Sequence, residues 1–280
     1  MNDETICGVE NLIRRRIQGL ESLNISWFGG EPLMASKIVL RISELAKRLS
    51  EKNGKKFFAD MTTNGFLLTP TLINSLVKWG VTNYQITLDG DKTWHNKSRK
   101  AITGKSTFDT IWKNLLYFKK TDLPVRIQLR IHYTPESIKV LPNFIDKICT
   151  EFLSDSRFHV FFHQIIPLGG PNDKNIKTLN HSEIEEYLVP LRKKIRILNP
   201  EGDPKPPDVC YAARPNSLVV RADGRIGKCT VILNDKRNTI GKINPDGTLD
   251  IKSSKLQRWI RGVETLDAGD LICPAKNLPF

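Results

Sequence analysis

Five short apolar segments alternate with longer amphipathic segments over the first 166 residues, and this alternation constrains the fold more than any other feature. The apolar segments cover residues 24–28, 57–62, 83–88, 125–132 and 158–166. Strands that are separated by helices need right-handed crossovers, so the pattern predicts a parallel sheet, either open or curled into a barrel.

The segments between these strands carry apolar residues at three- and four-residue spacing, which predicts helices. One more helix is expected ahead of the first strand, at residues 6–20. The others are expected at about 36–50, from Thr69 as cap to just before Gly80, at 107–119 and at about 137–152. An α/β architecture follows.

The alternation stops after Gly170, and the chain changes character again near residue 200. Residues 199–208 hold four prolines and a glycine, which is typical of a linker. Beyond it, segments 217–221 and 226–232 flank an Asp-Gly turn, and a second hairpin is expected around residues 245–247. We therefore expect two domains, residues 1–200 and residues 201–280.

Composition excludes several classes of protein. Hydrophobic residues make up 39% and charged residues 26%, as in ordinary globular chains rather than disordered ones. No apolar run is long enough to span a membrane, and Met1 to Thr5 do not resemble a signal peptide. A soluble, cytoplasmic protein is the expectation. The formal charge of +13 is scattered and has no groove-reading motif beside it, so nucleic-acid binding is not favoured.

Polar, glycine-containing turns follow the predicted strands, at the edge of a parallel sheet where chemistry gathers. These turns are Gly29-Gly30-Glu31-Pro32, Thr62-Thr63-Asn64-Gly65, Thr87-Leu88-Asp89-Gly90 and Pro167-Leu168-Gly169-Gly170. Glycines let a ligand approach the backbone, whose free carbonyls can accept from an ammonium group. Glu31 either fixes its loop or helps to neutralise a cation, and each turn taken alone also fits a plain strand-to-helix connection.

The first three turns, followed by His95 to Arg99 and by Gly104 to Asp109, closely resemble the radical SAM superfamily. The branch with a C-terminal SPASM/twitch domain is the most similar, and it includes anaerobic sulfatase-maturating enzymes and peptide-modifying maturases. The resemblance implies a partial (β/α)6 barrel and a small β-rich domain. It also implies S-adenosylmethionine (SAM) and [4Fe–4S] clusters as cofactors, with a peptide or protein substrate and a reductant as partners.

The same resemblance implies a role for particular residues. The Gly29-Gly30-Glu31-Pro32 turn would receive the amino group of SAM. Thr63 and Asn64 would lie near its ribose. Thr87 and Arg99 match positions that bind its carboxylate, although Arg99 as a plain surface charge stays an alternative.

Five cysteines without a signal peptide do not form a disulfide framework. Cys7 and Cys149 lie in helical patterns and fit as small apolar residues. Cys210, Cys229 and Cys273 resemble the SPASM pattern, which implies that they are metal ligands of an auxiliary [4Fe–4S] cluster. Two half-buried cysteines in a small β unit are the alternative for the first two.

The Cys-x3-Cys-x2-Cys loop that defines the superfamily is absent, because Cys7 is the only cysteine before residue 149. One thiolate does not hold a [4Fe–4S] cluster. We therefore expect a chain that lacks the first βα unit and is inactive by itself, or else a non-catalytic module that binds a peptide or SAM. Lys276 stands where the auxiliary pattern has a further cysteine, and Thr230 stands where sulfatase-maturating enzymes have an aspartate that can act as a base.

Overall fold

The computed structural model describes residues 1–101, 103–167, 173–201, 209–276 and 278. The chain forms two compact units. One is Glu21–Pro204, and the other joins Met1–Leu20 to Lys205–Phe280. The boundary lies close to the expected position near residue 200. The first 20 residues, however, group with the C-terminal unit, whereas the sequence pattern assigned them to the sheet domain.

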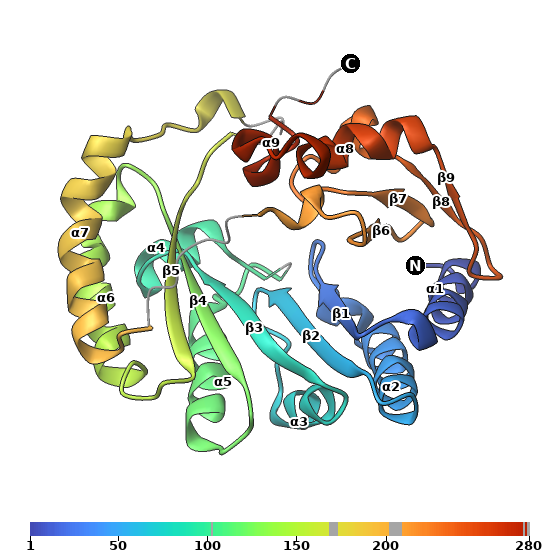
Figure 1. Ribbon diagram of the computed structural model, residues 1–280. Coiled ribbons are helices and arrows are strands. Elements are labelled where there is room, and N and C mark those ends of the chain that lie inside the picture. The colour runs from blue at the N-terminus through green and yellow to red at the C-terminus, as the bar shows by residue number, and fades with distance from the viewer. Residues whose placement is uncertain (102, 168–172, 202–208, 277, 279–280) are drawn as a thin grey trace. The chain divides into compact units, whose positions relative to one another are not determined.

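Five parallel strands form the sheet of the Glu21–Pro204 unit, as the alternation predicts (Figure 1). The strands lie in chain order, so each pairs with the next one along the sequence. Their bounds are β1 Ser22–Trp27, β2 Lys56–Thr63, β3 Val81–Leu88, β4 Arg126–Tyr133 and β5 Phe158–Gln164. Such a sheet places all strand-end turns at one edge, apart from residues 168–170 of the last turn, which lie outside the described residues.

Helices connect the strands and cover one face of the sheet (Figure 1). Each helix expected in this unit is present within a few residues of its expected ends, and two further helices that the sequence analysis did not predict occur at 92–98 and 181–198. The bounds are α2 Ser36–Lys52, α3 Pro70–Lys78, α4 Lys92–Ser98, α5 Phe108–Lys120, α6 Leu141–Glu151 and α7 His181–Leu198. The α/β architecture inferred from the sequence is thus confirmed.

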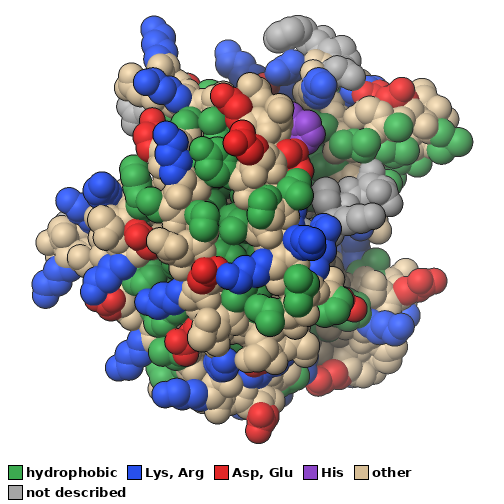
Figure 2. Space-filling view, turned by 90° about the vertical axis from the view of Figure 1, so that its left-hand side faces the viewer, with side chains coloured by type: hydrophobic (Ala, Val, Ile, Leu, Met, Phe, Trp, Pro, Cys, Tyr) green, Lys and Arg blue, Asp and Glu red, His purple; other side chains and the backbone are tan. Residues whose placement is uncertain are grey.

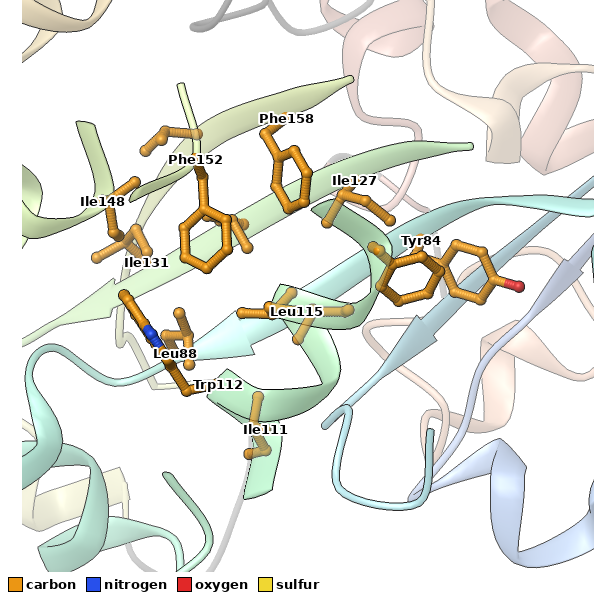
Figure 3. Packing of buried hydrophobic residues seen from close by; sticks show 14 of the residues in the cluster. Tyr84, Leu88, Ile111, Trp112, Leu115, Ile127, Ile131, Ile148, Phe152 and Phe158 are labelled. Atoms are coloured by element: carbon orange, nitrogen blue, oxygen red, sulfur yellow. The ribbon is translucent and has the colours of Figure 1, made fainter. Parts of the chain in front are cut away.

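The core of this unit lies between the sheet and these helices (Figure 3). Apolar side chains at alternate strand positions, such as Ile127 and Ile131 of β4, point towards the helices and are fully buried. Leu115 of α5 and Phe152 just after α6 fill the space opposite them. Because strand side chains alternate between faces, this packing leaves the other half of each strand on the opposite face.

α7 continues the helical layer beyond the point where the strand and helix alternation stops. It begins with a capping box, in which the Asn180 side chain accepts from the Glu183 N–H and the Glu183 side chain accepts from the Asn180 N–H. Leu188, Leu191 and Ile195 are buried at three- and four-residue spacing, and they dock the helix onto the same core.

The second unit contains a four-stranded antiparallel sheet, so both predicted hairpins are present. Its strands are β6 Val219–Val220, β7 Arg225–Gly227, β8 Gly241–Ile243 and β9 Leu249–Ile251. Two helices that the sequence analysis did not predict follow, α8 Ser253–Thr265 and α9 Ala268–Ile272. Trp259 of α8 is fully buried with Ile226 and Ile240 in a core that belongs to this unit alone.

α1, Asp3–Arg16, belongs to this second unit because it packs against the β8–β9 hairpin. The Asn11 side chain donates to the carbonyl of Pro245 at 2.9 Å. A Cβ on Gly8 would lie 2.6 Å from the Asn244 carbonyl oxygen, and one on Gly247 would lie 2.4 Å from the Leu12 nitrogen. Two glycines thus let the helix and the hairpin turn approach closely, and no sequence periodicity reveals that contact.

Among the helices that the structure describes, none is long and apolar enough to cross a membrane.

Candidate functional site

The face of the sheet opposite the helices is polar. Parallel sheets are usually apolar on both faces, so a polar face marks a surface that serves something other than packing. We call this surface the polar face. Its side chains include Asn24 and Ser26 on β1, Asp60 and Thr62 on β2, Asn83, Gln85 and Thr87 on β3, Gln128, Arg130 and His132 on β4, and His159, Phe161 and His163 on β5. The exposed Phe58 of β2 and Arg126 of β4 lie on the same face.

Strand register places these side chains in rows that run across the sheet. Thr62 pairs with Gln85, Gln85 with Gln128, and Gln128 with His159. Within this row the Gln85 amide donates to the Gln128 side-chain oxygen at 2.7 Å. One row closer to the N-terminal ends of the strands, the Ser26 hydroxyl donates to the Asp60 carboxylate at 2.6 Å. The polar face is therefore a connected layer of hydrogen-bonding groups.

The glycine turn after β1 is open on its outer side. A Cβ on Gly29 or on Gly30 would meet no atom within 4 Å, and Gly29 has a φ of +146°, which favours glycine. Because nothing of the chain fills this space, the backbone of the turn is open to a ligand. This is the approach that the sequence predicts for the amino group of SAM.

The Glu31 carboxylate ties this turn to the end of β2. It accepts from the backbone N–H groups of Leu33 at 3.0 Å and Asn64 at 2.8 Å, and from the Thr63 hydroxyl at 2.7 Å. Of the two roles weighed for Glu31, fixing the loop is the one for which the structure provides contacts. Pro32 opens the short 3-10 helix Pro32–Ala35 that follows.

Thr63 and Asn64 use most of their side-chain hydrogen-bonding atoms within their own turn. The Thr63 hydroxyl also accepts from the Gly65 N–H at 3.1 Å, and the Asn64 side-chain oxygen accepts from the Phe66 N–H at 2.9 Å. Gly65 has a φ of +76°, and a Cβ there would lie 2.9 Å from Ile86. These residues shape the edge of the candidate site, and the Asn64 amide nitrogen is the polar group they leave for a ligand.

A buried carboxylate, Asp89, organises the turn after β3. It pairs with Arg99 at 2.9 Å from Nε, accepts from the Ser98 hydroxyl at 2.7 Å and lies 3.1 Å from His132 Nδ1. Burial raises the pKa of Asp89, but its bond to His132, the charge of Arg99 and its bond to Ser98 outweigh burial and hold that pKa well below its usual value. Arg99 is therefore not the free surface charge considered as an alternative, since it is anchored to the end of β3.

The His95 ring has a defined tautomer and links the end of β3 to the segment around Arg99. Its Nδ1 accepts from the Asp89 N–H at 3.2 Å, so Nε2 carries the proton and donates to the Thr107 hydroxyl at 3.1 Å. That hydroxyl in turn donates to the Arg99 carbonyl at 2.8 Å. Burial lowers the pKa of His95 to about 4, which keeps the ring neutral near pH 7. This series of hydrogen bonds sets the backbone position of Arg99.

The sequence analysis selected Thr87 and Arg99 at this site but did not assign a role to the groups that hold Arg99, Asp89 and His132. The signal that would have found them is the period of two within the strands. Polar residues at every second position of β4, Gln128, Arg130 and His132, alternate with fully apolar ones, and a helix-covered sheet needs no such pattern.

The three cysteines predicted as metal ligands lie in the second unit. Cys229 is buried, Cys210 is half-buried and Cys273 is exposed. Burial raises the pKa of Cys210, and the thiolates of Cys229 and Cys273 raise it further, so these two lie within electrostatic reach. Among the residues that the structure describes, however, no group of three or more Cys, His, Asp or Glu is arranged to hold a metal ion. As they stand, these residues do not fit a complete cluster, and their role stays a prediction.

Two side chains organise the backbone around Cys229. The buried Asn238 side chain accepts from the N–H groups of Lys228 and Cys229 and donates to the Cys229 carbonyl. Thr230, which stands in place of the family's aspartate, has its hydroxyl 2.6 Å from the Tyr211 hydroxyl. Sequence reasoning found the cysteines but missed Asn238, which lies nine residues downstream of Cys229.

A hollow on the outer side of α7 contains none of the predicted residues. It is lined by Glu185, Val189, Arg192, Lys193, Arg196 and Ile197. Figure 2 views the molecule from the side of α6 and α7, and it shows hydrophobic side chains interspersed with lysines and arginines there. The hollow is open and lies on one helix, so the candidate site is the polar face and its strand-end turns.

Comparison with known proteins identifies the family. A model described as the radical SAM superfamily matches residues 9–148, which is half of the chain. The chain belongs to the radical SAM superfamily. No curated protein matches the chain with significance.

Solved structures share the fold. The anaerobic sulfatase-maturating enzyme anSMEcpe, solved with AdoMet and a Kp18Cys peptide, is 18% identical with a TM-score of 0.66, over 92% of this chain and 72% of that one. SuiB from Streptococcus suis, solved with S-adenosylmethionine, is 15% identical with a TM-score of 0.60, over 97% of this chain and 65% of that one. SuiB has also been solved with its precursor peptide SuiA.

Proposed function

We propose that the chain binds SAM at the strand-end turns of β1 to β3. The observation that carries this proposal is the Glu31 carboxylate, which joins two of these turns beside the open backbone of Gly29 and Gly30. The proposed cofactor-binding residues are Gly29, Gly30, Glu31, Pro32, Thr63, Asn64, Thr87 and Arg99.

Each group has a chemical role in this proposal. The carbonyls of Gly29 and Gly30 accept from the amino group of SAM. The Thr87 hydroxyl and the Arg99 guanidinium donate to its carboxylate, and the Asp89 contact at Arg99 Nε leaves Nη1 to do so. Neutral His95 holds the Arg99 backbone without adding a charge. When bound beside a reduced [4Fe–4S] cluster, SAM supplies the radical chemistry of the superfamily.

The cysteines of the chain do not fit the catalytic cluster. Cys149 is buried, as expected of a small apolar residue, but Cys7 is exposed on α1, contrary to that expectation, and no second cysteine occurs before Cys149. A [4Fe–4S] cluster needs at least the three thiolates of the family's loop. We therefore assign no radical step to these 280 residues alone.

For the complete enzyme that this chain resembles, the proposed activity is modification of a peptide or protein side chain, with a reductant as partner. It rests on the resemblance to peptide-modifying maturases and on the peptides bound in anSMEcpe and SuiB. Sulfatase maturation is not proposed, because Thr230 cannot act as a base at neutral pH. A module that binds SAM or a peptide without redox chemistry is the second candidate.

Gly30→Ala tests the SAM site. Nothing lies within 4 Å of an added Cβ, so the fold is expected to stay intact while the methyl group obstructs the ligand. Isothermal titration calorimetry with SAM should show at least about tenfold weaker binding for this variant. Gly19→Ala is the matched control, since its Cβ also meets nothing, and it should bind normally. Equal affinities of both variants and of an Arg99→Ala variant would contradict the proposal.

Iron content separates the two candidate functions. Anaerobic reconstitution of the chain with iron and sulfide should yield fewer than about four irons per chain, because the described residues hold no group of three or more Cys, His, Asp or Glu arranged to bind a metal ion. A stable [4Fe–4S] spectrum with about four irons per chain would rule out the binding-only candidate.

A further inference from the structure

Arg130 lies in the middle of the polar face, on β4. Its register partner on β3 is Thr87, and its partner on β5 is Phe161. Side chains at these positions point to the same face of the sheet. The guanidinium therefore lies beside the proposed SAM site, one strand further from the glycine turn than Thr87.

The guanidinium of Arg130 is poorly satisfied. Among the described residues, its hydrogen bond runs from Nη1 to the Gln85 side-chain oxygen at 3.4 Å, and its Nε is buried without a hydrogen-bond partner. In the described part of the chain, no carboxylate lies within ion-pair distance of it. Arg157 shows the opposite case, because its Nε, Nη1 and Nη2 all donate to Asp155 or to backbone carbonyls. Most donors of Arg130 are thus left for another molecule.

The charges around Arg130 do not cancel. Asp89 is the carboxylate of this cluster, and Arg99 pairs with it directly. Burial lowers the pKa of His163 to about 4 and lowers that of His132, so both rings are neutral near pH 7. The net charge of the cluster is therefore about +1, and it belongs to Arg130. Arg130 is half-buried with its Nε fully buried, and a partly desolvated charge without an ion-pair partner among the described residues favours binding of one anion.

We propose that Arg130 binds a carboxylate of the substrate, an acidic peptide side chain, on the polar face. Calling this ligand a substrate rests on the proposed function, whereas the carboxylate site itself is argued from the contacts of Arg130. A planar guanidinium matches a carboxylate because it donates two parallel hydrogen bonds.

The proposed function already assigns Thr87 and Arg99 to the carboxylate of SAM, so we assign the carboxylate at Arg130 to a second ligand. Thr87 is the register partner of Arg130, so competition with SAM tests this assignment. Glu31 ties the glycine turn to the end of β2. β4 lies two strands beyond β2, a separation of about 10 Å. The amino and carboxylate groups of SAM are attached to the same carbon atom, so an amino group held at the glycine turn keeps its carboxylate near β2 and β3. Arg130 is then free for the substrate.

Imidazole NMR signals test the proposal directly, because His132 and His163 lie on Arg130's side of the polar face. The probe is N-acetylglutamate α-amide, and its neutral isostere N-acetylglutamine amide is the control ligand. We expect saturable shifts of the His132 and His163 signals with the acid only. The buried His95 ring, bonded to Asp89 and Thr107, should not move. Adding SAM should not displace the probe.

Three variants assign the effect to Arg130. Arg130→Met should weaken probe binding at least about tenfold, and Arg130→Lys should retain part of it. Arg126→Met removes the same charge from an exposed position of the same strand and should bind normally. SAM affinity of the Arg130→Met variant should change less than about twofold.

Distinct outcomes would overturn the inference. Absence of a saturable shift, an equal response to the neutral ligand, or equal binding by the Arg130→Met variant would each do so. Displacement of the probe by SAM, or a loss of SAM affinity in Arg130→Met, would assign Arg130 to the carboxylate of SAM instead. Failure of SAM to bind the unmodified chain would reject the proposed function. The carboxylate site would still be decided by the probe titration and the Arg130→Met variant.

Discussion

Two carboxylates, Glu31 and Asp89, determine the local geometry of the candidate site. Each accepts from several donors that come from different segments, so each fixes one turn against another. Glu31 joins the turns after β1 and β2, and Asp89 joins the end of β3 to α4 and to His132 of β4. Charged acceptors bind more strongly than neutral ones, which suits them to positioning loops.

Asp89→Asn is expected to lower the free energy of unfolding by about 1–3 kcal/mol at pH 7, because Arg99 loses its counterion while buried bonds weaken. The pKa of Asp89 is lower in the folded chain than its unfolded value of about 3.9, so its contribution is present above that value and is lost as pH falls below it. Urea unfolding at several pH values measures this.

The comparison is made between the unmodified chain and the variant. Their stability difference should shrink as the pH falls below about 4. Glu44→Gln, at an exposed residue bonded to Arg48 on α2, is the control and should cost little. A difference between Asp89→Asn and the unmodified chain that does not depend on pH would contradict the assignment.

At the scale of elements, the sequence pattern predicted the strands and most helices, because each is encoded by its own apolar period. It gave no bounds for α4 or α7, and it missed α8 and α9. In α8 the expectation of short β segments prevailed over helical spacing at Leu256, Trp259 and Ile260. It also assigned α1 to the sheet domain. A helix's periodicity identifies its buried face but not its partner, and here the partner is a hairpin more than 200 residues away.

Gly8→Leu should detach α1 from the β8–β9 hairpin, because its Cβ would lie 2.6 Å from the Asn244 carbonyl oxygen. Hydrogen exchange should become faster in α1, β8 and β9, and should stay unchanged in β1 to β5. Gly19→Leu introduces the same side chain where a Cβ meets nothing, and it should leave exchange in the hairpin unchanged. Faster exchange throughout the Glu21–Pro204 unit would contradict the assignment of α1 to the other unit.

At the scale of the whole molecule, the chain carries two separate hydrophobic cores. One lies under the parallel sheet, and the other contains Trp259 and its neighbours together with Val9 and Leu12 of α1. Each core is continuous within its own unit. Stability is therefore the property of two bodies and not of one.

Calorimetry of the unmodified chain should show two transitions, and SAM should raise the melting temperature of only one, because a ligand stabilises the unit that binds it. The transition of the Glu21–Pro204 unit is expected at low temperature, since its strand β1 pairs on one side only among the described residues and is half-exposed. Removing the ligand should return the scan to its original form. A single sharp transition at high temperature would contradict this picture.

The sequence by itself determined the parallel sheet, the helical layer, both hairpins and the polar turns at the strand ends, because these depend on local periods and turn residues. It also selected Thr87 and Arg99 through the family's ordered motifs. Only the tertiary structure decided that Asp89 anchors Arg99, that Glu31 links two turns, that α1 packs on the distant hairpin and that Arg130 is left without a counterion. These facts depend on which strands are neighbours and in what register, and strand pairing is set by long-range packing rather than by any local pattern.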